Sequence, residues 1–280
     1  MIPIIDTEGI LHALCYVFDK QYLAIEEKLS PFYINLISIP IFKEWSEINN
    51  STSYIEILKD LYDLDKLIEK RIETKFRQIF KYCNATHFCG FIHGTGNYRK
   101  YVDPTYKANR KGERPICLDR IVKIAEQRYK LYRVDNIEVD DAVIITYNHY
   151  KEQGLDVVIV TPDKDLDQQW GKHLKLKHDG SLEYFENTEL EANRILFKSN
   201  IVGDVAENCK GIEGIGEVGA EKIINETTWG GYNSIRVLNA YIGKYGELEG
   251  THRFSKTFQL MYMLRKPERD FIVPQLIKLT

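Results

Sequence analysis

Four short clusters of acidic residues, far apart in the sequence, each lie where a strand or a helix is expected to end. Their members are Asp6; Glu138, Asp140 and Asp141; Asp163, Asp165 and Asp167; and Asp204 and Glu207. Like charges do not share one site unless a cation holds them there, because their repulsion raises their pKa values. Carboxylate oxygens are the ligands that Mg²⁺ or Mn²⁺ requires, and two such ions side by side can cleave a phosphodiester. If folding brings the clusters together, the chain contains a site for divalent metal ions.

Each acidic cluster also has an ordinary structural explanation. Asp6 follows an apolar strand and could cap the next helix. Glu138 and Asp141 are three residues apart and should project from one helix face, whereas Asp140 should point elsewhere unless the first turn is irregular. Acidic residues also favour helix N-termini. The third cluster occupies a strand-to-helix turn, where aspartates are common caps, and the two acids of the fourth are one helical turn apart. The occurrence of all four clusters in this order, together with the motifs below, favours a common site.

The composition is that of a globular protein rather than a membrane protein. Hydrophobic residues are 44% and charged residues 28% of the 280 residues, and no apolar run approaches the length of a membrane span. The first six residues lack the basic segment of a secretory signal. Five cysteines without paired spacing are typical of reduced thiols. We therefore expect a cytoplasmic protein, in a bacterial or phage-infected host cytosol.

One stretch contains four potential zinc ligands, Cys83, His87, Cys89 and His93. The alternating pattern of residues 86–92 is typical of a strand rather than of a compact zinc site, and we do not expect zinc there.

The distribution of charge indicates a polyanionic partner although the net charge is −3. Between Arg99 and Arg133 the chain has eleven basic residues and only four acidic ones. A basic segment beside an acidic metal site would allow binding of a nucleic acid while the metal site itself stays negative. Some of these residues are also expected on the solvated face of a helix.

Strand and helix signals alternate, which predicts an α/β fold with a mainly parallel sheet. Strands are expected at 2–5, 86–93 and 155–160, and the functional crevice of such a sheet lies beyond the carboxyl ends of its strands, where Asp6 and Asp163 fall. A helix is expected from about Gly9, and another at 53–82, opened by a capping box at Ser53–Glu56. Apolar residues recur at helical spacing from Ile57 to Ile79, a stripe that we assign to core packing. The other expected elements are a loop or arch at 94–115, helices at 116–131 and 138–154, a hairpin at 173–186 with its tip at Asp179-Gly180, and a largely helical remainder.

Residues 208–220 have the pattern of a helix–hairpin–helix. Gly214-Ile-Gly216 predicts a tight turn that lets the backbone approach a partner closely. A helix from about Glu217 to Glu226 would direct unpaired N–H groups toward phosphate. Such a motif binds the nucleic-acid backbone without reading bases.

The ordered blocks resemble the flap endonuclease/5′-nuclease superfamily, particularly the stand-alone enzymes of bacteriophages and the 5′-nuclease domain of bacterial DNA polymerase I. The blocks are Ile-Ile-Asp6; Arg99 to Arg110; Ile-Glu138-Val-Asp140-Asp141; Val-Thr-Pro-Asp163 to Gln168; and Gly203 to Ala220. The resemblance implies a PIN-like, mainly parallel sheet flanked by helices, with a helical arch and a C-terminal helix–hairpin–helix. It implies a nuclease core at 1–199, with a helical insertion at about 30–80 and a basic arch at about 94–133, and a DNA-binding helical region at 200–280.

The resemblance also implies roles for individual residues. Two Mg²⁺ or Mn²⁺ ions would be bound by Asp6, Glu138, Asp140, Asp141, Asp163, Asp165, Asp204 and Glu207, with His93 and Asp167 as weaker candidates. Arg99, Lys107 and Arg110 would line the arch and steady the scissile phosphate. DNA would contact Lys100, Lys111, Arg114, Lys210, Gly211, Gly214, Ile215, Gly216, Gly219 and Lys222, and carbonyls of the hairpin could hold K⁺.

Three features depart from the family pattern. His93 stands at or next to a position where the family has an aspartate, and imidazole is a poorer Mg²⁺ ligand than carboxylate. Glu207 replaces an aspartate, and the span from Asp6 to the arch is unusually long.

The leading hypothesis is a structure-selective 5′-nuclease, acting as a 5′-3′ exonuclease or flap endonuclease in replication or repair. Its partners would be DNA with a 5′ flap or 5′ end, RNA primers on DNA, and replication proteins, and the chain would be a monomer. The alternatives are a degenerate relative that binds branched nucleic acid without cutting it, and a smaller α/β ribonuclease of the toxin-module kind. The sequence does not separate exonuclease from flap endonuclease activity, or RNA from DNA as the 5′ strand.

Overall fold

The computed structural model describes residues 1–15, 18, 24–25, 52–109, 115–224, 230–267 and 271–279. These residues belong to two compact units. The sheet unit consists of Met1–Thr7, Cys83–Gly112 and Tyr132–Thr280, and the helical unit consists of Glu8–Tyr82 and Glu113–Leu131. No helix in the described ranges has the length and apolar character needed to cross a membrane.

The sheet unit is built on a seven-stranded, mainly parallel sheet, as predicted. Its strand order is β3-β2-β1-β4-β5-β6, and β9 pairs with β2. The first five of these strands run parallel, whereas β6 is antiparallel to β5 and β9 is antiparallel to β2. The strands are β1 (Ile2–Asp6), β2 (His87–His93), β3 (Tyr132–Val134), β4 (Val157–Thr161), β5 (Gly171–Leu176), β6 (Leu182–Asn187) and β9 (Ile277–Lys278).

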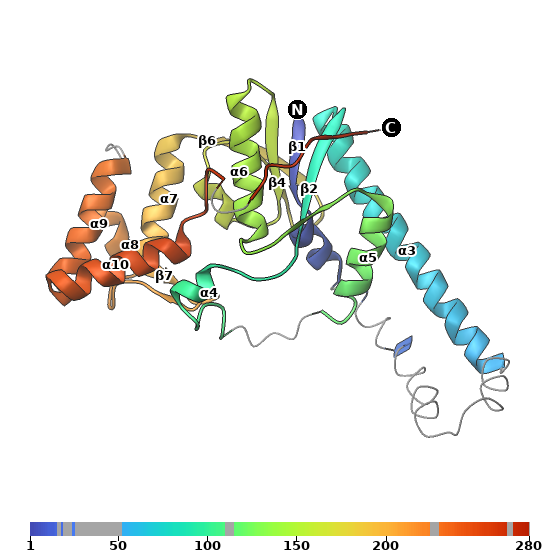
Figure 1. Cartoon of the computed structure of the whole chain (residues 1–280), viewed down its shortest axis with the longest axis horizontal. Coiled ribbons are helices and arrows are strands. Elements are labelled where there is room, and N and C mark those ends of the chain that lie inside the picture. The colour runs from blue at the N-terminus through green and yellow to red at the C-terminus, as the bar shows by residue number, and fades with distance from the viewer. Residues whose placement is uncertain are drawn as a thin grey trace. The chain divides into compact units, whose positions relative to one another are not determined.

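Apolar strands form the centre of this sheet because both of their faces are covered. All of β4 is buried, and so is β1 from Pro3 onward. Helix α6 (Val139–Glu152) packs against β1, β2 and β4, and Figure 1 shows it beside them. Its Ala142, Val143 and Ile145 are fully buried in the main core.

The sequence-based element predictions are confirmed for the central strands, for α6 and for the β5–β6 hairpin with its tip at Asp179-Gly180. The prediction of a largely helical remainder was incomplete because it missed β9 and a two-stranded ladder at residues 203–210. Strand β3 was also missed. Strands of two or three residues at the edge of a sheet carry no measurable periodicity.

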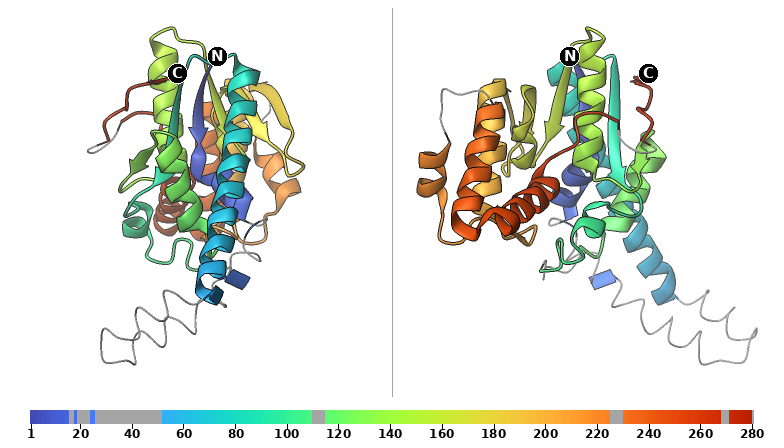
Figure 2. Two further views of the ribbon diagram at one scale, coloured as in Figure 1. Left: turned by 90° about the vertical axis from the view of Figure 1, so that its right-hand side faces the viewer. Right: turned by 60° about the vertical axis from the view of Figure 1, so that its left-hand side comes forward.

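Four helices of the sheet unit form a second core. They are α7 (Glu189–Val202), α8 (Glu217–Ile223), α9 (Gly230–Tyr245) and α10 (Glu247–Met261), and Figure 2 shows α7, α9 and α10 grouped together. Phe197, Ile201 and Val237 are buried between them, and the Tyr241 hydroxyl donates to the Asn200 carbonyl at 2.8 Å. The predicted boundary between 199 and 200 falls inside α7, and the division into 1–199 and 200–280 stays a prediction.

A small two-stranded ladder, β7 (Gly203–Asp204) with β8 (Cys209–Lys210), follows α7. Gly203 has φ +78°, and a Cβ there would lie 2.4 Å from the Gly211 nitrogen. A Cβ on Gly211 would lie 2.1 Å from the Ile201 carbonyl oxygen. The two chain segments can therefore meet only through glycine.

Gly211→Ala is expected to lower the free energy of unfolding by more than about 2 kcal/mol, because the backbone must separate to admit the methyl group. Urea unfolding measures the change. Gly243→Ala is the matched control: it lies in α9 with open space around it, and alanine there should stabilise by about 0.5–1 kcal/mol. Equal stability of the two variants would contradict the close approach at Gly211.

The helical unit contains α3 (Thr52–Cys83, all but its last residue) and α5 (Leu118–Arg128). The predicted apolar stripe of α3 is confirmed as core, with Ile68, Phe76 and Ile79 fully buried. Phe76 stacks on Tyr129 at a centroid distance of 4.3 Å. The side chains of the predicted capping box at 53–56, and residues 30–51 of the predicted insertion, lie outside what the structure describes.

Candidate metal centre

The carboxyl edge of the sheet holds the first acidic residues together through a threonine hydroxyl. Ile5 pairs with Val160, so Asp6 and Thr161 end adjacent strands side by side. The Thr161 Oγ1 donates to Asp6 Oδ2 at 2.8 Å and accepts from the Asp163 N–H at 2.9 Å. The Asp165 N–H then donates to Asp163 Oδ1 at 2.9 Å. This chain of hydrogen bonds fixes the predicted first and third clusters at one place.

The N-terminus of α6 brings a second pair of acids to this edge. Glu138 is the N-cap of α6, with an extended backbone at φ −84° and ψ 159°. Burial raises the pKa of Asp140 well above its ordinary value, and the neighbouring charges of Asp6, Glu138 and Asp163 raise it further. Asp140 therefore lies among the predicted ligands.

Glu138 and Asp141 lie on one side at the start of α6, as expected. Both carboxylates face the Arg99 guanidinium, at 3.4 and 2.6 Å, and the Glu138 N–H donates to Asp141 at 3.1 Å. The helix begins only at Val139, and Glu138 precedes it in an extended conformation. Asp140 joins the acidic site. Asp141 is fully buried and points into the protein.

Arg99 binds the carboxylate of Asp141 instead of lining an arch, which corrects the expectation for both residues. The Arg99 Nη1 and Nη2 donate to Asp141 at 2.6 and 2.9 Å. The same guanidinium donates to the carbonyls of Leu260 and Tyr262 at 2.9 and 2.8 Å. Arg99 is only 1% exposed, so a phosphate group cannot reach its guanidinium. Asp141 also accepts hydrogen bonds from the backbone N–H groups of Glu138 and Leu264. Its carboxylate therefore has a structural role.

The last acidic cluster lies in a turn and not, as expected, on a helix. Asp204 ends β7, and residues 205–208 form the turn to β8. The Glu207 N–H donates to Asp204 Oδ1 at 3.1 Å. Burial raises the pKa of Asp165 to about 6, with further contributions from the charges of Asp163, Asp204 and Glu207. This turn therefore contributes its acids to the same region as Asp163 and Asp165.

The Lys107 ammonium group links two of the acidic residues, Glu138 and Glu207. Its Nζ pairs with Glu138 Oε1 and lies 3.2 Å from Glu207 Oε2, and its N–H donates to the Glu207 carbonyl at 3.0 Å. Tyr106 and Asn97 also donate to the Glu138 carboxylate, at 3.2 and 2.8 Å. Lys107 has φ +59°, an unusual conformation for a residue with a side chain. The ammonium group thus offsets part of the negative charge of this site.

The oxygen-rich donor set fits hard divalent cations such as Mg²⁺ or Mn²⁺ better than soft metals. Asp6, Asp140 and Asp163 carry like charges that repel one another, and a bound cation would offset this repulsion. Within the described ranges, no three His, Cys, Asp or Glu side chains are already closed into a metal-ligand set. A metal ion would therefore require side chains to leave the positions they occupy here, with Lys107 displaced from Glu138.

The two weaker candidates are His93 and Asp167. His93 ends β2 two residues beyond Phe91, which pairs with Asp6, so it lies at the same carboxyl edge of the sheet. It is exposed and pairs in register with Val134 of β3. The Asp167 carboxylate binds the Lys175 ammonium at 2.7 Å and is already neutralised.

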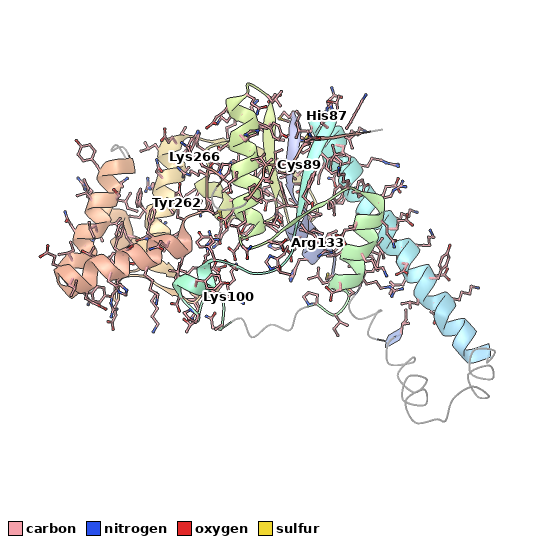
Figure 3. The ribbon with its side chains drawn as sticks, viewed as in Figure 1. His87, Cys89, Lys100, Arg133, Tyr262 and Lys266 are labelled. Atoms are coloured by element: carbon pink, nitrogen blue, oxygen red, sulfur yellow. The ribbon has the colours of Figure 1, made fainter. Side chains whose placement is uncertain are left out.

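The predicted nucleic-acid contacts are only partly described. Arg110, Lys111 and Arg114 lie outside the described residues. Gly214 has φ +81° in a turn before α8, and Gly219 lies against Ile215. Helix α8 ends at Ile223, earlier than the expected Glu226. The described basic side chains are exposed: Lys100 at α4 (Arg99–Val102; Figure 3), Lys210 and Lys222.

Sequence reasoning assigned no role to Thr161, Tyr106 or Asn97, which position the acids. Thr161 and Tyr106 lie inside the recognised blocks and could have been singled out there. Asn97 carries no local signal because its partner, Glu138, is 41 residues away.

Residues 69–195 match the model of the 5′-3′ exonuclease N-terminal, resolvase-like domain. The match covers slightly less than half of the chain, and this segment is similar to that family. The 5′-3′ exonuclease of Mycoplasmopsis pulmonis is 34% identical over 126 residues, which are 42% of this chain and 38% of that protein. DNA polymerase I of Caldicellulosiruptor bescii is 32% identical over 147 residues, which are 46% of this chain and 17% of the polymerase. The chain therefore spans well under half the length of these relatives.

Two solved structures share the fold. A T5 protein co-crystallised with metal ions superposes with a TM-score of 0.55 at 16% identity, covering 69% of this chain and 80% of that chain. The T5 5′-exonuclease with bound zinc gives a TM-score of 0.52 at 16% identity, covering 69% and 78%. At this identity the likeness concerns the fold, and it agrees with the predicted mainly parallel sheet flanked by helices.

Proposed function

We propose that the chain is a metal-dependent, structure-selective 5′-nuclease, which hydrolyses phosphodiester bonds at 5′ flaps or 5′ ends. The observation that carries this proposal is the convergence of acids from four distant segments on the carboxyl edge of one parallel sheet. It is supported by the match of residues 69–195 to the 5′-3′ exonuclease domain. The role in replication or repair, the RNA primer as a substrate, replication proteins as partners, the monomeric state and the cytosolic location belong to this proposal.

The acidic residues form two sets: those near Asp140 that raise its pKa, and those near Asp165 that raise its pKa. Asp6, Glu138, Asp140 and Asp163 would hold one divalent ion, and Asp163, Asp165, Asp204 and Glu207 would hold the other. Two such ions lower the pKa of an attacking water and stabilise the leaving oxygen. Mg²⁺ and Mn²⁺ suit these ligands, and we assign K⁺, if it binds, to carbonyls of the turn near Gly214.

Lys107 would act on the substrate once it leaves the carboxylates. Its ammonium would then lie against the scissile phosphate and offset the charge that develops in the transition state. Arg110 is proposed to act with it. Lys100 would contact the strand backbone, and the turn at Gly214 with α8 would contact the duplex as the second half of a helix–hairpin–helix. Arg99 and Asp141 have no place in this chemistry.

The test is cleavage of a labelled 5′ flap with Mg²⁺ and with Mn²⁺. We expect cutting with either metal and none in EDTA, whereas the double variant D163N/D165N should bind the flap without cutting it. Product lengths from flap, nicked-duplex and RNA-primed substrates separate exonuclease from endonuclease action.

A folded protein that binds the flap but never cuts it with either metal would refute the nuclease proposal. That outcome would favour the second candidate, a nucleic-acid-binding relative without catalysis. The observation in favour of this candidate is His93, which stands where the family has a carboxylate.

A further inference from the structure

A cavity of about 520 Å³ lies in the sheet unit, at the end of α6 far from the acidic residues. Asn148 and Lys151 line it from the last turns of α6, and Trp170 lines it just before β5 begins. Lys151 follows Asp140 by eleven residues along the helix, a rise of about 16 Å at 1.5 Å per residue. The acids lie where parallel strands end, and Trp170 lies where one begins. The cavity is therefore separate from the candidate metal centre.

The lining of this cavity is positively charged. Lys151, Arg265 and Lys266 face it, against a single carboxylate, Glu152. None of the three cations has a carboxylate within ion-pair distance in the described ranges of the chain. Burial lowers the pKa of both Lys151 and Arg265, and the charges of Glu186 near Lys151 and Glu189 near Arg265 offset this only in part. A bound anion would supply the missing partner.

Aromatic rings and backbone groups hold two of the cations in place. The Arg265 guanidinium lies 4.7 Å from the Trp170 ring centroid and 5.5 Å from that of Tyr262, and it donates to the Gln168 carbonyl at 3.0 Å. The Lys151 ammonium lies 5.7 Å from the Trp170 centroid. Cations fixed in this way lose little freedom when a ligand binds.

Tyr262 and Lys266 both lie on the segment that follows α10, as Figure 3 shows. The Asn148 amide donates to the Arg265 carbonyl at 3.3 Å and so ties this segment to α6. The cavity is thus bounded by segments that are fixed to each other, and its position does not depend on the helical unit.

We propose that this cavity binds a nucleoside phosphate. The phosphate would lie among Lys151, Arg265 and Lys266, and the sugar and base would lie against the aromatic wall. The volume is within the range of small-molecule sites and well above the need of one inorganic anion. The same chemistry is presented by a free mononucleotide and by the terminal nucleotide of a nucleic-acid strand. This site is additional to the proposed nuclease centre.

The experiment is calorimetric titration of the whole chain with dAMP in EDTA, which excludes any contribution from divalent metals. We expect saturable binding, and the double variant K151Q/K266Q should bind at least about tenfold more weakly, since it removes two charged hydrogen-bond donors to the phosphate. Lys177→Gln is the matched control, because Lys177 pairs with Glu183 at the tip of the β5–β6 hairpin. The control should bind like the parent chain.

Two further ligands identify the source of the nucleotide. A 5′-phosphorylated oligothymidylate that binds more tightly than dAMP, and loses its advantage in K151Q/K266Q, indicates a strand terminus; weaker binding of the oligonucleotide indicates a free nucleotide. Inorganic phosphate that binds as well as dAMP, no saturable binding, or binding unchanged in K151Q/K266Q would overturn the proposal. Because EDTA is present throughout, these outcomes are independent of whether the chain cleaves DNA.

Discussion

Asp140→Asn is expected to reduce flap cleavage by at least about a hundredfold while making the metal-free protein more stable. The loss of activity follows because an amide replaces a carboxylate ligand, and even indirect partners of a metal site contribute 10–100-fold. The gain in stability follows because burial and the charges of Asp6, Glu138 and Asp163 disfavour the ionised carboxyl group. Cleavage assays and urea unfolding in EDTA measure the two effects.

Lower cleavage activity combined with higher stability distinguishes a metal ligand from a helix cap. If Asp140 served only to complement the dipole at the start of α6, removal of its charge would lower stability. Mg²⁺ should raise the thermal midpoint of the parent chain and should raise that of Asp140→Asn much less, because binding to the native state alone stabilises it. Lower stability in EDTA together with normal cleavage would contradict the assignment.

Asp156→Asn is the control for this prediction. Asp156 immediately precedes β4, at the opposite end of that strand from Thr161, and pairs with Lys172 at 2.6 Å. Its side chain is 56% exposed, and such pairs contribute about 0–1 kcal/mol. Cleavage by this variant should equal that of the parent chain.

Arg99→Met is expected to lower the free energy of unfolding by about 3–5 kcal/mol, because it leaves Asp141 charged and buried without its partner. Loss of the bonds to the Leu260 and Tyr262 carbonyls adds to the effect. Urea unfolding measures it. Arg99→Lys should recover only part of the loss, since an ammonium group cannot reproduce the two parallel bonds to a carboxylate.

The double variant R99M/D141L tests the origin of this loss. Removal of both charges should recover much of the stability, because the penalty comes from the unpaired carboxylate rather than from the absence of the pair. Arg253→Gln, in the exposed pair with Glu249, is the control and should leave the free energy of unfolding nearly unchanged. A loss below 1 kcal/mol in Arg99→Met would contradict the burial of this ion pair.

The sequence predicted the parts of the fold that carry a regular pattern. The apolar runs of β1 and β4, the helical stripe from Leu64 to Ile79, and the Asp179-Gly180 turn are local signals, and the structure contains each of these elements. The short strands β3 and β9 depend on neighbours distant in the chain, so no local pattern marks them.

The candidate site was predictable in composition but not in detail. Acids of all four clusters converge, but the choice between Asp140 and Asp141 depends on where α6 begins, which is uncertain by a residue or two from sequence. The burial of Arg99 depends on Asp141, 42 residues away, and on carbonyls at the end of α10. A basic residue in a basic segment carries no sign of such a partner.

The single hydroxyl of Thr161 makes the alignment of two strands a requirement of the chemistry as well as of the fold. With Ile5 opposite Val160, Asp6 and Asp163 approach the same hydroxyl. Neighbouring residues of a strand face opposite sides, so one residue inserted into β1 would turn Asp6 away while leaving the composition of the chain almost unchanged. Strand interiors here should therefore accept exchanges of one apolar residue for another far more readily than any change in length.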